Sequence, residues 1–186
     1  MGISSTQFTN AMRQFPAAVN IVTTGSGDTR AGLTATAVIA LTAAPPQIAV
    51  AICRSASAYR TLRMMEYFCV NTLTSTQADL ARRFAGGVKG LERFSFGNWE
   101  TLATGAPALV GALANFDCRT AQVLEFSTHT LFVGDVECVR KNETKTPLLF
   151  VDGDWATLLR GEQPPCATDG VGHPGARAPE CVYSAN

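Results

Sequence analysis

One long uncharged run, from Ala31 to Cys53, limits the possible folds of this chain more than any other segment. It contains no Asp, Glu, Lys or Arg, and its length would allow it to span a membrane. Pro45 and Pro46 would break a helix near its middle, and the residues before them alternate with a period of two. The run therefore predicts two buried strands joined by a proline turn, and no membrane association.

Most other patterned segments also have the composition of strands. We expect helices only over residues 9–15, over 57–65 and from Ser75 or Thr76 to Phe84, and nothing alternates as strand, helix, strand. The predicted fold is mainly β, an antiparallel barrel with a few short peripheral helices. Within the strand at 32–42, one face should hold Leu33, Ala35, Ala37, Ile39 and Leu41. The predicted strands are 17–24, 32–42, 47–53, 67–73, 112–116, 120–127, 129–140, 148–151 and 155–159.

Composition divides the chain into one domain and a tail. Hydrophobic residues make up 46% of the whole chain, so residues 1–160 can bury a substantial core. Residues 161–186 are rich in Gly and Pro and poor in large apolar side chains, so we expect a flexible tail. The N-terminus has no apolar stretch typical of a signal peptide, which predicts a cytoplasmic protein.

Charge and cysteine content exclude several classes of function. Lys+Arg and Asp+Glu both number 15, so the chain has no basic surface for nucleic acid. Four of the six cysteines lie in apolar, strand-like segments and are expected to act as small buried hydrophobes: Cys53, Cys69, Cys118 and Cys138. The tail residues Cys166, His173 and Cys181 are spaced too widely for a zinc site, so no metal is predicted.

The usual signatures of nucleotide binding and hydrolysis are missing. The chain lacks GxGxxG after a strand, GxxxxGK[ST], HExxH and GxSxG, and it has only two histidines. Instead, hydroxyls alternate with small residues at Thr34 and Thr36, and Lys89 lies in a glycine-rich loop. The segment Arg54-Ser55-Ala56-Ser57 adds hydroxyls before a predicted helix. Exposed strand threonines and helix caps would explain these residues equally well, but together they suit a planar heterocycle joined to a phosphate, as in a flavin nucleotide.

The order of several motifs resembles the short-chain flavin reductase family. The run GLTATAVIALTAAPPQIAVAICRSASAYRTLRMMEYFCVNTL is followed by LARRFAG and then by HTLFVGDV, and the similarity covers about residues 8–159. The resemblance implies an FMN-binding split-barrel fold, a homodimer, and NAD(P)H-dependent reduction of FAD or FMN. It further implies that reduced flavin diffuses to the oxygenase component of a two-component monooxygenase acting on an aromatic or phenolic compound. The resemblance does not decide whether the flavin is FAD or FMN, or whether the reductant is NADH or NADPH.

The same resemblance implies roles for individual residues. The isoalloxazine edge would meet Thr34, Ala35 and Thr36. The ribityl and phosphate groups would be bound by Arg54, Ser55 and Ser57, and the ring or ribityl side would be contacted by Asn71 and Leu73. The phosphate or adenylate end would meet Phe84, Lys89 and Arg93. His129 would stand near the nicotinamide and position it.

One departure from the family pattern and two alternatives accompany this interpretation. Val151 and Asp152 stand where the family usually has a Tyr/His-Arg pair, so no nicotinamide contact is carried over from that stretch. The nearer alternative is a split-barrel protein that binds flavin or haem, or an oxidase, without reductase turnover. The remoter alternative is a non-enzymatic carrier with an apolar ligand in the barrel mouth.

Overall fold

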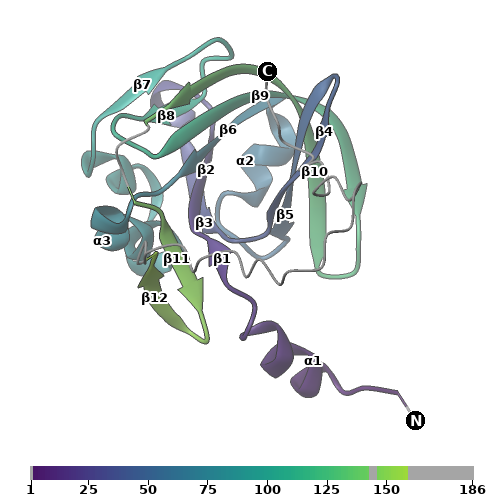
Figure 1. The fold of residues 1–186 in the computed structure, drawn as a ribbon. Coiled ribbons are helices and arrows are strands. Elements are labelled where there is room, and N and C mark those ends of the chain that lie inside the picture. The colour runs from purple at the N-terminus through teal and green to yellow at the C-terminus, as the bar shows by residue number, and fades with distance from the viewer. Residues whose placement is uncertain (1, 143–145, 159–186) are drawn as a thin grey trace, which may run out of the picture.

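The main body of the protein is a seven-stranded antiparallel sheet curved into a barrel (Figure 1). The computed structural model describes residues 2–142 and 146–158. The strands are ordered β3-β2-β6-β9-β10-β5-β4, and the mainly β, antiparallel prediction is confirmed. These strands are β2 (Asn20–Thr24), β3 (Ala31–Ala35), β4 (Val38–Ala43), β5 (Pro46–Cys53), β6 (Tyr67–Thr72), β9 (Ala114–Glu125) and β10 (His129–Lys141).

Two small sheets and several short helices lie around the barrel. One sheet has the order β1-β11-β12, and β7 pairs with β8 in the other. Their strands are β1 (Ala17–Ala18), β7 (Trp99–Thr101), β8 (Pro107–Leu109), β11 (Leu148–Val151) and β12 (Asp154–Thr157). The α-helices are α1 (Ser5–Met12), α2 (Tyr59–Met64) and α3 (Ala78–Arg82). Short 3₁₀ helices are η1 (Gly27–Thr29), η2 (Ser75–Gln77) and η4 (Gly90–Ser95), and η3 (Arg83–Gly87) is a π-helical turn.

The two edge strands of the sheet, β3 and β4, are consecutive in the chain. At Thr36 and Ala37 the chain leaves its pairing with β2 and joins β5, where the Ala51 amide donates to the Ala37 carbonyl at 3.0 Å. The chain itself therefore closes the ring. The prediction of one strand over 32–42 was wrong because this crossing separates two strands that pair with different partners.

The crossing also changes which side chains are buried. Leu33 and Ala35 lie in the barrel interior, whereas Ile39 and Leu41 are 56% and 45% exposed. The predicted shared face of these residues is therefore wrong. Of the two strands expected to be buried on either side of Pro45 and Pro46, only β5 is largely buried, because β4 is an edge strand open to solvent.

Two apolar cores hold the barrel and its helices together. The barrel interior contains Val50, Phe68 and Phe132. Helix α2, seen through the ring of strands (Figure 1), contributes Leu62, and Ala58 just before the helix joins the same core. On the other side of the β2–β6 surface, a second core joins the sheet to α3, η3 and η4. Packing on both faces of these central strands fixes the position of η3 beside β3.

Several element boundaries differ from the predictions. Strand β9 is continuous where two strands were expected. Its pairing with β10 shifts register at two points instead of ending between them. Helix α1 begins before the predicted helix because the Ser4 hydroxyl accepts a hydrogen bond from the Gln7 amide at 3.2 Å. The helix expected up to Phe84 is divided into η2, α3 and η3, and Gly86 has a φ of 129° in the last turn.

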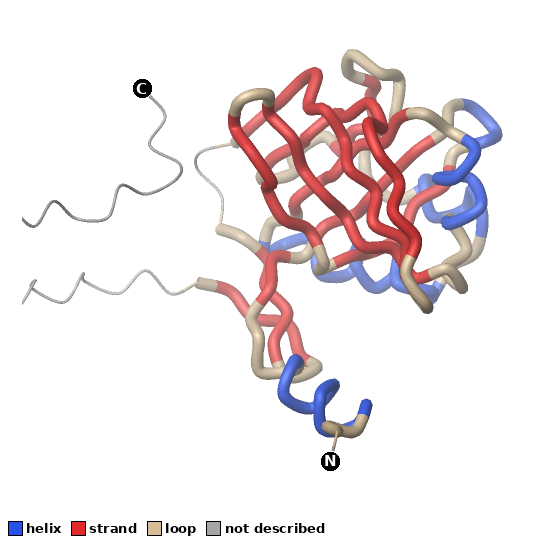
Figure 2. The backbone as a smooth tube through the Cα atoms, turned by 90° about the vertical axis from the view of Figure 1, so that its right-hand side faces the viewer, coloured by secondary structure: helices blue, strands red, loops and turns tan. Residues whose placement is uncertain are grey.

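Among the residues that the structure describes, no helix covers one face of the sheet (Figure 2). Figure 2 shows these strands face-on, with the helices behind the sheet and α1 set apart below. Within residues 2–142 and 146–158, no helix is long and apolar enough to cross a bilayer. The predicted tail over 161–186, with Cys166, His173 and Cys181, lies outside the described residues.

Candidate functional site

A cavity of about 610 Å³ opens beside the crossing between β3 and β4. Its walls come from this crossing, the end of β5, the loop before α2, and η3 with the loop that follows. The cavity brings together most of the residues that the sequence analysis selected: Thr34, Ala35, Thr36, Ser55, Ser57, Phe84, Lys89, Arg93 and His129. The remaining lining residues are Leu33, Ala37, Ala51, Cys53, Ala56, Ala85 and Gly86.

One wall of the cavity is neutral and built from small residues. The Thr34 hydroxyl donates to the Ala81 carbonyl at 2.7 Å, so its proton is already used and its oxygen remains available as an acceptor. Ala35, Thr36 and Ala37 continue this wall without a bulky side chain. A planar ring system can therefore approach the backbone of this strand closely.

The adjoining wall, after β5, carries hydroxyl groups and a thiol. Ser55 and Ser57 line it, and the Ser55 hydroxyl lies 3.1 Å from the Cys53 sulfur. Hydrogen bonds from Ser55 lower the pKa of the Cys53 thiol. Cys53 was expected to act as a buried apolar residue, but it is half-buried on the cavity wall, as the last residue of β5.

Two positively charged residues, Arg93 and Lys89, also line the cavity. The Arg93 side chain is 5% exposed, donates from Nη1 to the Gly32 carbonyl at 2.8 Å, and donates from Nε to the Val88 carbonyl. Burial lowers the pKa of Arg93, although a guanidinium stays protonated in proteins. Within the described residues, neither Arg93 nor the exposed Lys89 forms an ion pair. These two charges favour an anion beside them.

An aromatic cluster fixes η3 against β3 and so shapes the cavity. The Phe84 ring lies 5.3 Å from Phe94 and 5.5 Å from Trp99 between centroids. Phe84 also packs over Gly32, where an added Cβ would come 2.8 Å from Phe84 Cε1. The glycine is therefore required for the close approach of η3 to the strand.

His129 begins β10 at the exposed side of the cavity. Its Nδ1 lies 2.8 Å from the Thr128 hydroxyl, and it pairs in register with Cys53 across the β10–β5 ladder. This contact orients the imidazole and leaves Nε2 without a hydrogen-bond partner among the described residues. A ring at this edge can contact a ligand that enters from the solvent side.

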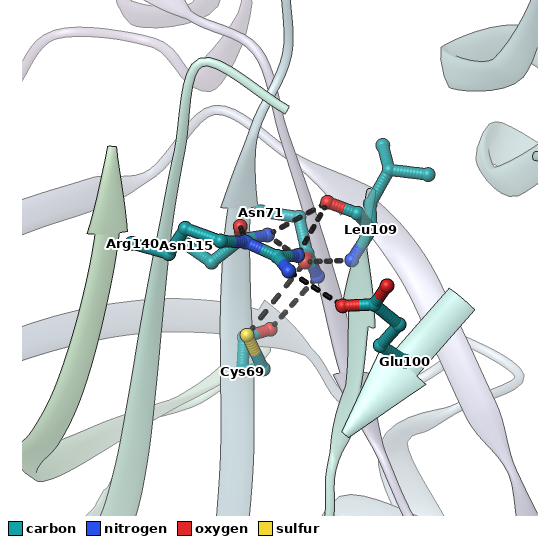
Figure 3. Close-up of polar contacts among 6 residues, drawn as sticks. All are labelled: Cys69, Asn71, Glu100, Leu109, Asn115 and Arg140. Atoms are coloured by element: carbon teal, nitrogen blue, oxygen red, sulfur yellow. Dashed lines mark hydrogen bonds and ion pairs between the residues drawn. The ribbon is translucent and has the colours of Figure 1, made fainter. Parts of the chain in front are cut away.

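Asn71 and Leu73, which the sequence analysis also selected, do not line the cavity. Asn71 is fully buried: Oδ1 accepts from the Leu109 amide and from Asn115 Nδ2, both at 2.7 Å, and Nδ2 donates to the Ile21 carbonyl at 2.9 Å. Figure 3 shows Asn71 at the centre of this network. Leu73 is fully buried in the core beneath α3.

The network around Asn71 continues to the protein surface through Arg140. Its Nε donates to Asn115 Oδ1 at 2.9 Å, and its Nη1 donates to Glu100 at 2.7 Å (Figure 3). Asn71 and Asn115 also face each other in the β6–β9 register. Two asparagines on strand-like segments are the sequence signal for this network. Only the strand register shows that they face each other.

Arg54 also lies outside the lining of this cavity. It contacts Glu125 at 2.5 Å and borders a second cavity of about 580 Å³, which shares Ala56 and Ser57 with the first. The arrangement as a whole offers a neutral, flat wall, a row of hydroxyl groups and two cationic residues. Such a site can hold a heterocycle joined to a phosphate.

Comparisons with known proteins agree with this geometry. The family described as "Flavin reductase like domain" matches residues 12–159. The FMN reductase (NADH) RutF of Serratia proteamaculans is 37% identical over 158 residues, which are 85% of this chain and 90% of the relative.

Two solved structures have the same fold. The NADH:FAD oxidoreductase SgcE6 of Streptomyces globisporus, in complex with NAD and FAD fragments, aligns with a TM-score of 0.75 and 26% identity over 87% of this chain and 94% of that one. BorF, the flavin reductase component of a bacterial two-component tryptophan halogenase, aligns with a TM-score of 0.76 and 26% identity over 83% and 98%. The predicted split-barrel architecture is confirmed.

Proposed function

Because the chain belongs to the flavin reductase-like family, we propose that it is an NADH-dependent flavin reductase acting on FMN or FAD. When both are bound, the nicotinamide supplies a hydride from C4 and the flavin accepts it at N5. The observation that carries the proposal is that small neutral residues, hydroxyl groups and two cationic residues line one cavity. This combination matches the two chemical parts of a flavin nucleotide.

The charges of Arg93 and Lys89 support the fit of a flavin phosphate. Arg93 is held rigidly by two backbone carbonyls, and its buried guanidinium has no carboxylate partner among the described residues. Lys89 can approach the same phosphate from the solvent side, because it is exposed in the loop after Gly87. Ser55 and Ser57 would donate hydrogen bonds to the ribityl and phosphate oxygens.

The neutral wall would hold the ring system. Thr34, Ala35 and Thr36 would contact the isoalloxazine edge, and Phe84 would close the cavity beside it. His129, at the exposed edge, would orient the nicotinamide over the ring. The reaction needs rings stacked at reaction distance, with no acid, base or nucleophile from the protein, so this set of residues is sufficient.

We further propose that reduced flavin leaves the cavity for the oxygenase component of a two-component system, which would act on an aromatic or phenolic compound. BorF supports this role because it is the reductase component of such a halogenase. The cavity is open to solvent, and its ring-binding wall is uncharged, which favours release. Mixing the protein with FMN, NADH and a separately purified flavin-dependent oxygenase should support product formation, including across a dialysis membrane that separates the two proteins.

A homodimer is also part of the proposal. Exposed apolar side chains lie on the outer face of the sheet: Ile39 and Leu124 are on it, and the register places Leu131 and Ala51 on the same face, next to His129 at the cavity. A second copy packed here would cover this apolar surface and border the cavity mouth. Light scattering should give the mass of a dimer, and Leu124→Lys should give a monomer while Leu91→Lys, at an exposed site on η4, should not.

Loss of nicotinamide absorbance tests the central proposal. The purified chain should oxidise NADH only when FMN or FAD is present, and the rate should saturate with flavin. Arg93→Gln should weaken FMN binding more than riboflavin binding, because riboflavin lacks the phosphate. Tight flavin binding without NADH oxidation would contradict the reductase proposal and favour a flavin-binding protein.

A further inference from the structure

The second cavity, beside the loop before α2, is lined by three exposed arginines. Its volume is about 580 Å³, and its lining residues are Arg54, Ala56, Ser57, Tyr59, Arg60 and Arg63. Arg60 and Arg63 are three positions apart on α2, so they lie on the same side of the helix. Positive charge is therefore concentrated at one place on the surface of a chain whose positive and negative residues are equal in number.

These charges are only partly compensated within the protein. Glu125 contacts two of the arginines, with Oε2 at 2.5 Å from Arg54 and Oε1 at 3.2 Å from Arg63. Arg60 forms no ion pair among the described residues. One carboxylate thus faces three guanidinium groups, and the cavity keeps an excess of positive charge that favours further carboxylates.

The lining of this cavity resembles a protein interface more than a pocket for a small molecule. Small-molecule pockets are lined mainly by apolar and aromatic side chains. Here the apolar part of the lining consists of Ala56 and the ring of Tyr59. Tyr59 belongs to the packing of the barrel, since its hydroxyl lies 3.0 Å from the Thr130 hydroxyl and its ring packs edge-on against Phe132. Arginine, by contrast, is enriched at protein interfaces and binds carboxylates through paired hydrogen bonds.

We propose that this cavity docks a carboxylate-rich segment of the protein that receives the reduced flavin. The cavity shares Ala56 and Ser57 with the cavity proposed to bind flavin, so a protein held by the arginines would lie beside the site from which the flavin leaves. Docking there would raise the local concentration of reduced flavin at its acceptor. The exposed charges would also steer an acidic partner to this side of the barrel. The choice of the flavin acceptor as the partner rests on the proposed reductase function.

Fluorescence anisotropy with labelled hexaglutamate and hexaglutamine peptides tests the docking site on the intact chain. Hexaglutamate should bind, more weakly as NaCl is raised, and hexaglutamine should not. The double variant Arg60→Gln, Arg63→Gln should weaken hexaglutamate binding about threefold to tenfold. FMN affinity and NADH oxidation with FMN should stay within about twofold, because neither arginine lines the flavin cavity. Arg119→Gln, at an exposed arginine paired with Glu137, is the matched control and should not change peptide binding.

Three outcomes of these measurements would overturn the proposal. Hexaglutamate could bind the double variant as tightly as the wild-type chain. Inorganic phosphate could displace hexaglutamate when chloride at the same ionic strength does not, which would assign the arginines to a small phosphate ligand. Light scattering could give the double variant a different mass from the wild-type chain, which would assign the arginines to a contact between two copies.

A transfer assay tests the identity of the partner. A flavin-dependent oxygenase carrying a hexaglutamate tail should form product at least about threefold faster with the wild-type chain than with the double variant, when FMN is scarcer than either protein. The same oxygenase with a hexaglutamine tail should not distinguish the two, and equal product formation in all four combinations would overturn the flavin acceptor as the partner. If the wild-type chain does not oxidise NADH with flavin, the proposed function fails, whereas the anisotropy titrations still decide whether the cavity binds a carboxylate-rich segment.

Discussion

Replacing Asn71 by Ala separates a structural role from a flavin-binding role for this residue. The substitution removes the acceptor for the buried Leu109 amide and for Asn115 Nδ2 and removes the donor to the Ile21 carbonyl. An unsatisfied buried donor costs about 1–3 kcal/mol. Asn115 keeps a second contact, to the Leu109 carbonyl at 3.2 Å, so its loss is smaller. We expect the free energy of unfolding to fall by about 3 kcal/mol, a large share of the roughly 5–15 kcal/mol typical of a domain.

Urea unfolding of the flavin-free protein measures this change, and fluorescence quenching measures the FMN dissociation constant of the same samples. FMN affinity should stay within about twofold, because Asn71 does not line the cavity. Asn98→Ala is the control, since that side chain is exposed and should change stability by less than about 0.5 kcal/mol. A stability loss below about 1 kcal/mol together with a tenfold weaker FMN affinity would refute the reasoning, because Asn71 would then act on the ligand.

Three further predictions concern the cavity wall. Gly32→Ala should destabilise the protein by about 1–3 kcal/mol and weaken FMN binding, because the added Cβ collides with Phe84; thermal unfolding and FMN titration measure both effects. His129→Ala should lower kcat/KM for NADH on the order of tenfold to a hundredfold while FMN affinity changes little, as steady-state kinetics and titration would show; equal losses in both would remove His129 from the nicotinamide. Since Ser55 lowers the pKa of Cys53, and burial raises the pKa of Cys118 to about 12, iodoacetamide at mildly alkaline pH should modify Cys53 before Cys118. Bound FMN should slow that reaction, which peptide mass spectrometry follows; preferential labelling of Cys118 would contradict the prediction.

The sequence predicts most strands because their patterns are local. Runs such as 67–73 and 47–53 combine β-branched and apolar residues at strand length, and the structure places β6 and β5 there. The crossing at Thr36 and Ala37 has no such signal, since small residues alternate smoothly through it. The sequence predicts two strands, 112–116 and 120–127, where β9 is continuous. Asp117 lies between them, and its buried carboxylate accepts hydrogen bonds from the Thr104 amide and hydroxyl.

The candidate site, like the fold, could be predicted from the sequence only where local motifs determine it. Motif order selected the hydroxyl residues and the cationic loop, and the fold brings them to one cavity. Motif order does not say which way a side chain points: Cys53 and Ser55 line the cavity, whereas Arg54 between them faces the neighbouring one. The predicted role of Asn71 fails for a related reason. A polar residue on a central strand can bind a ligand or join a buried hydrogen-bond network, and the residues on the neighbouring strands determine which of the two occurs.

The closure of the ring by its own chain has a thermodynamic consequence. Thr36 and Ala37, where the chain passes from one sheet edge to the other, also line the cavity that we propose binds flavin. A ligand that binds only when this crossing is formed adds its binding free energy to ring closure, by RT ln(1 + [L]/Kd). Bound flavin would thus stabilise the closed barrel. The Ala51 amide, which donates a hydrogen bond to the Ala37 carbonyl, would exchange its proton more slowly as flavin concentration rises.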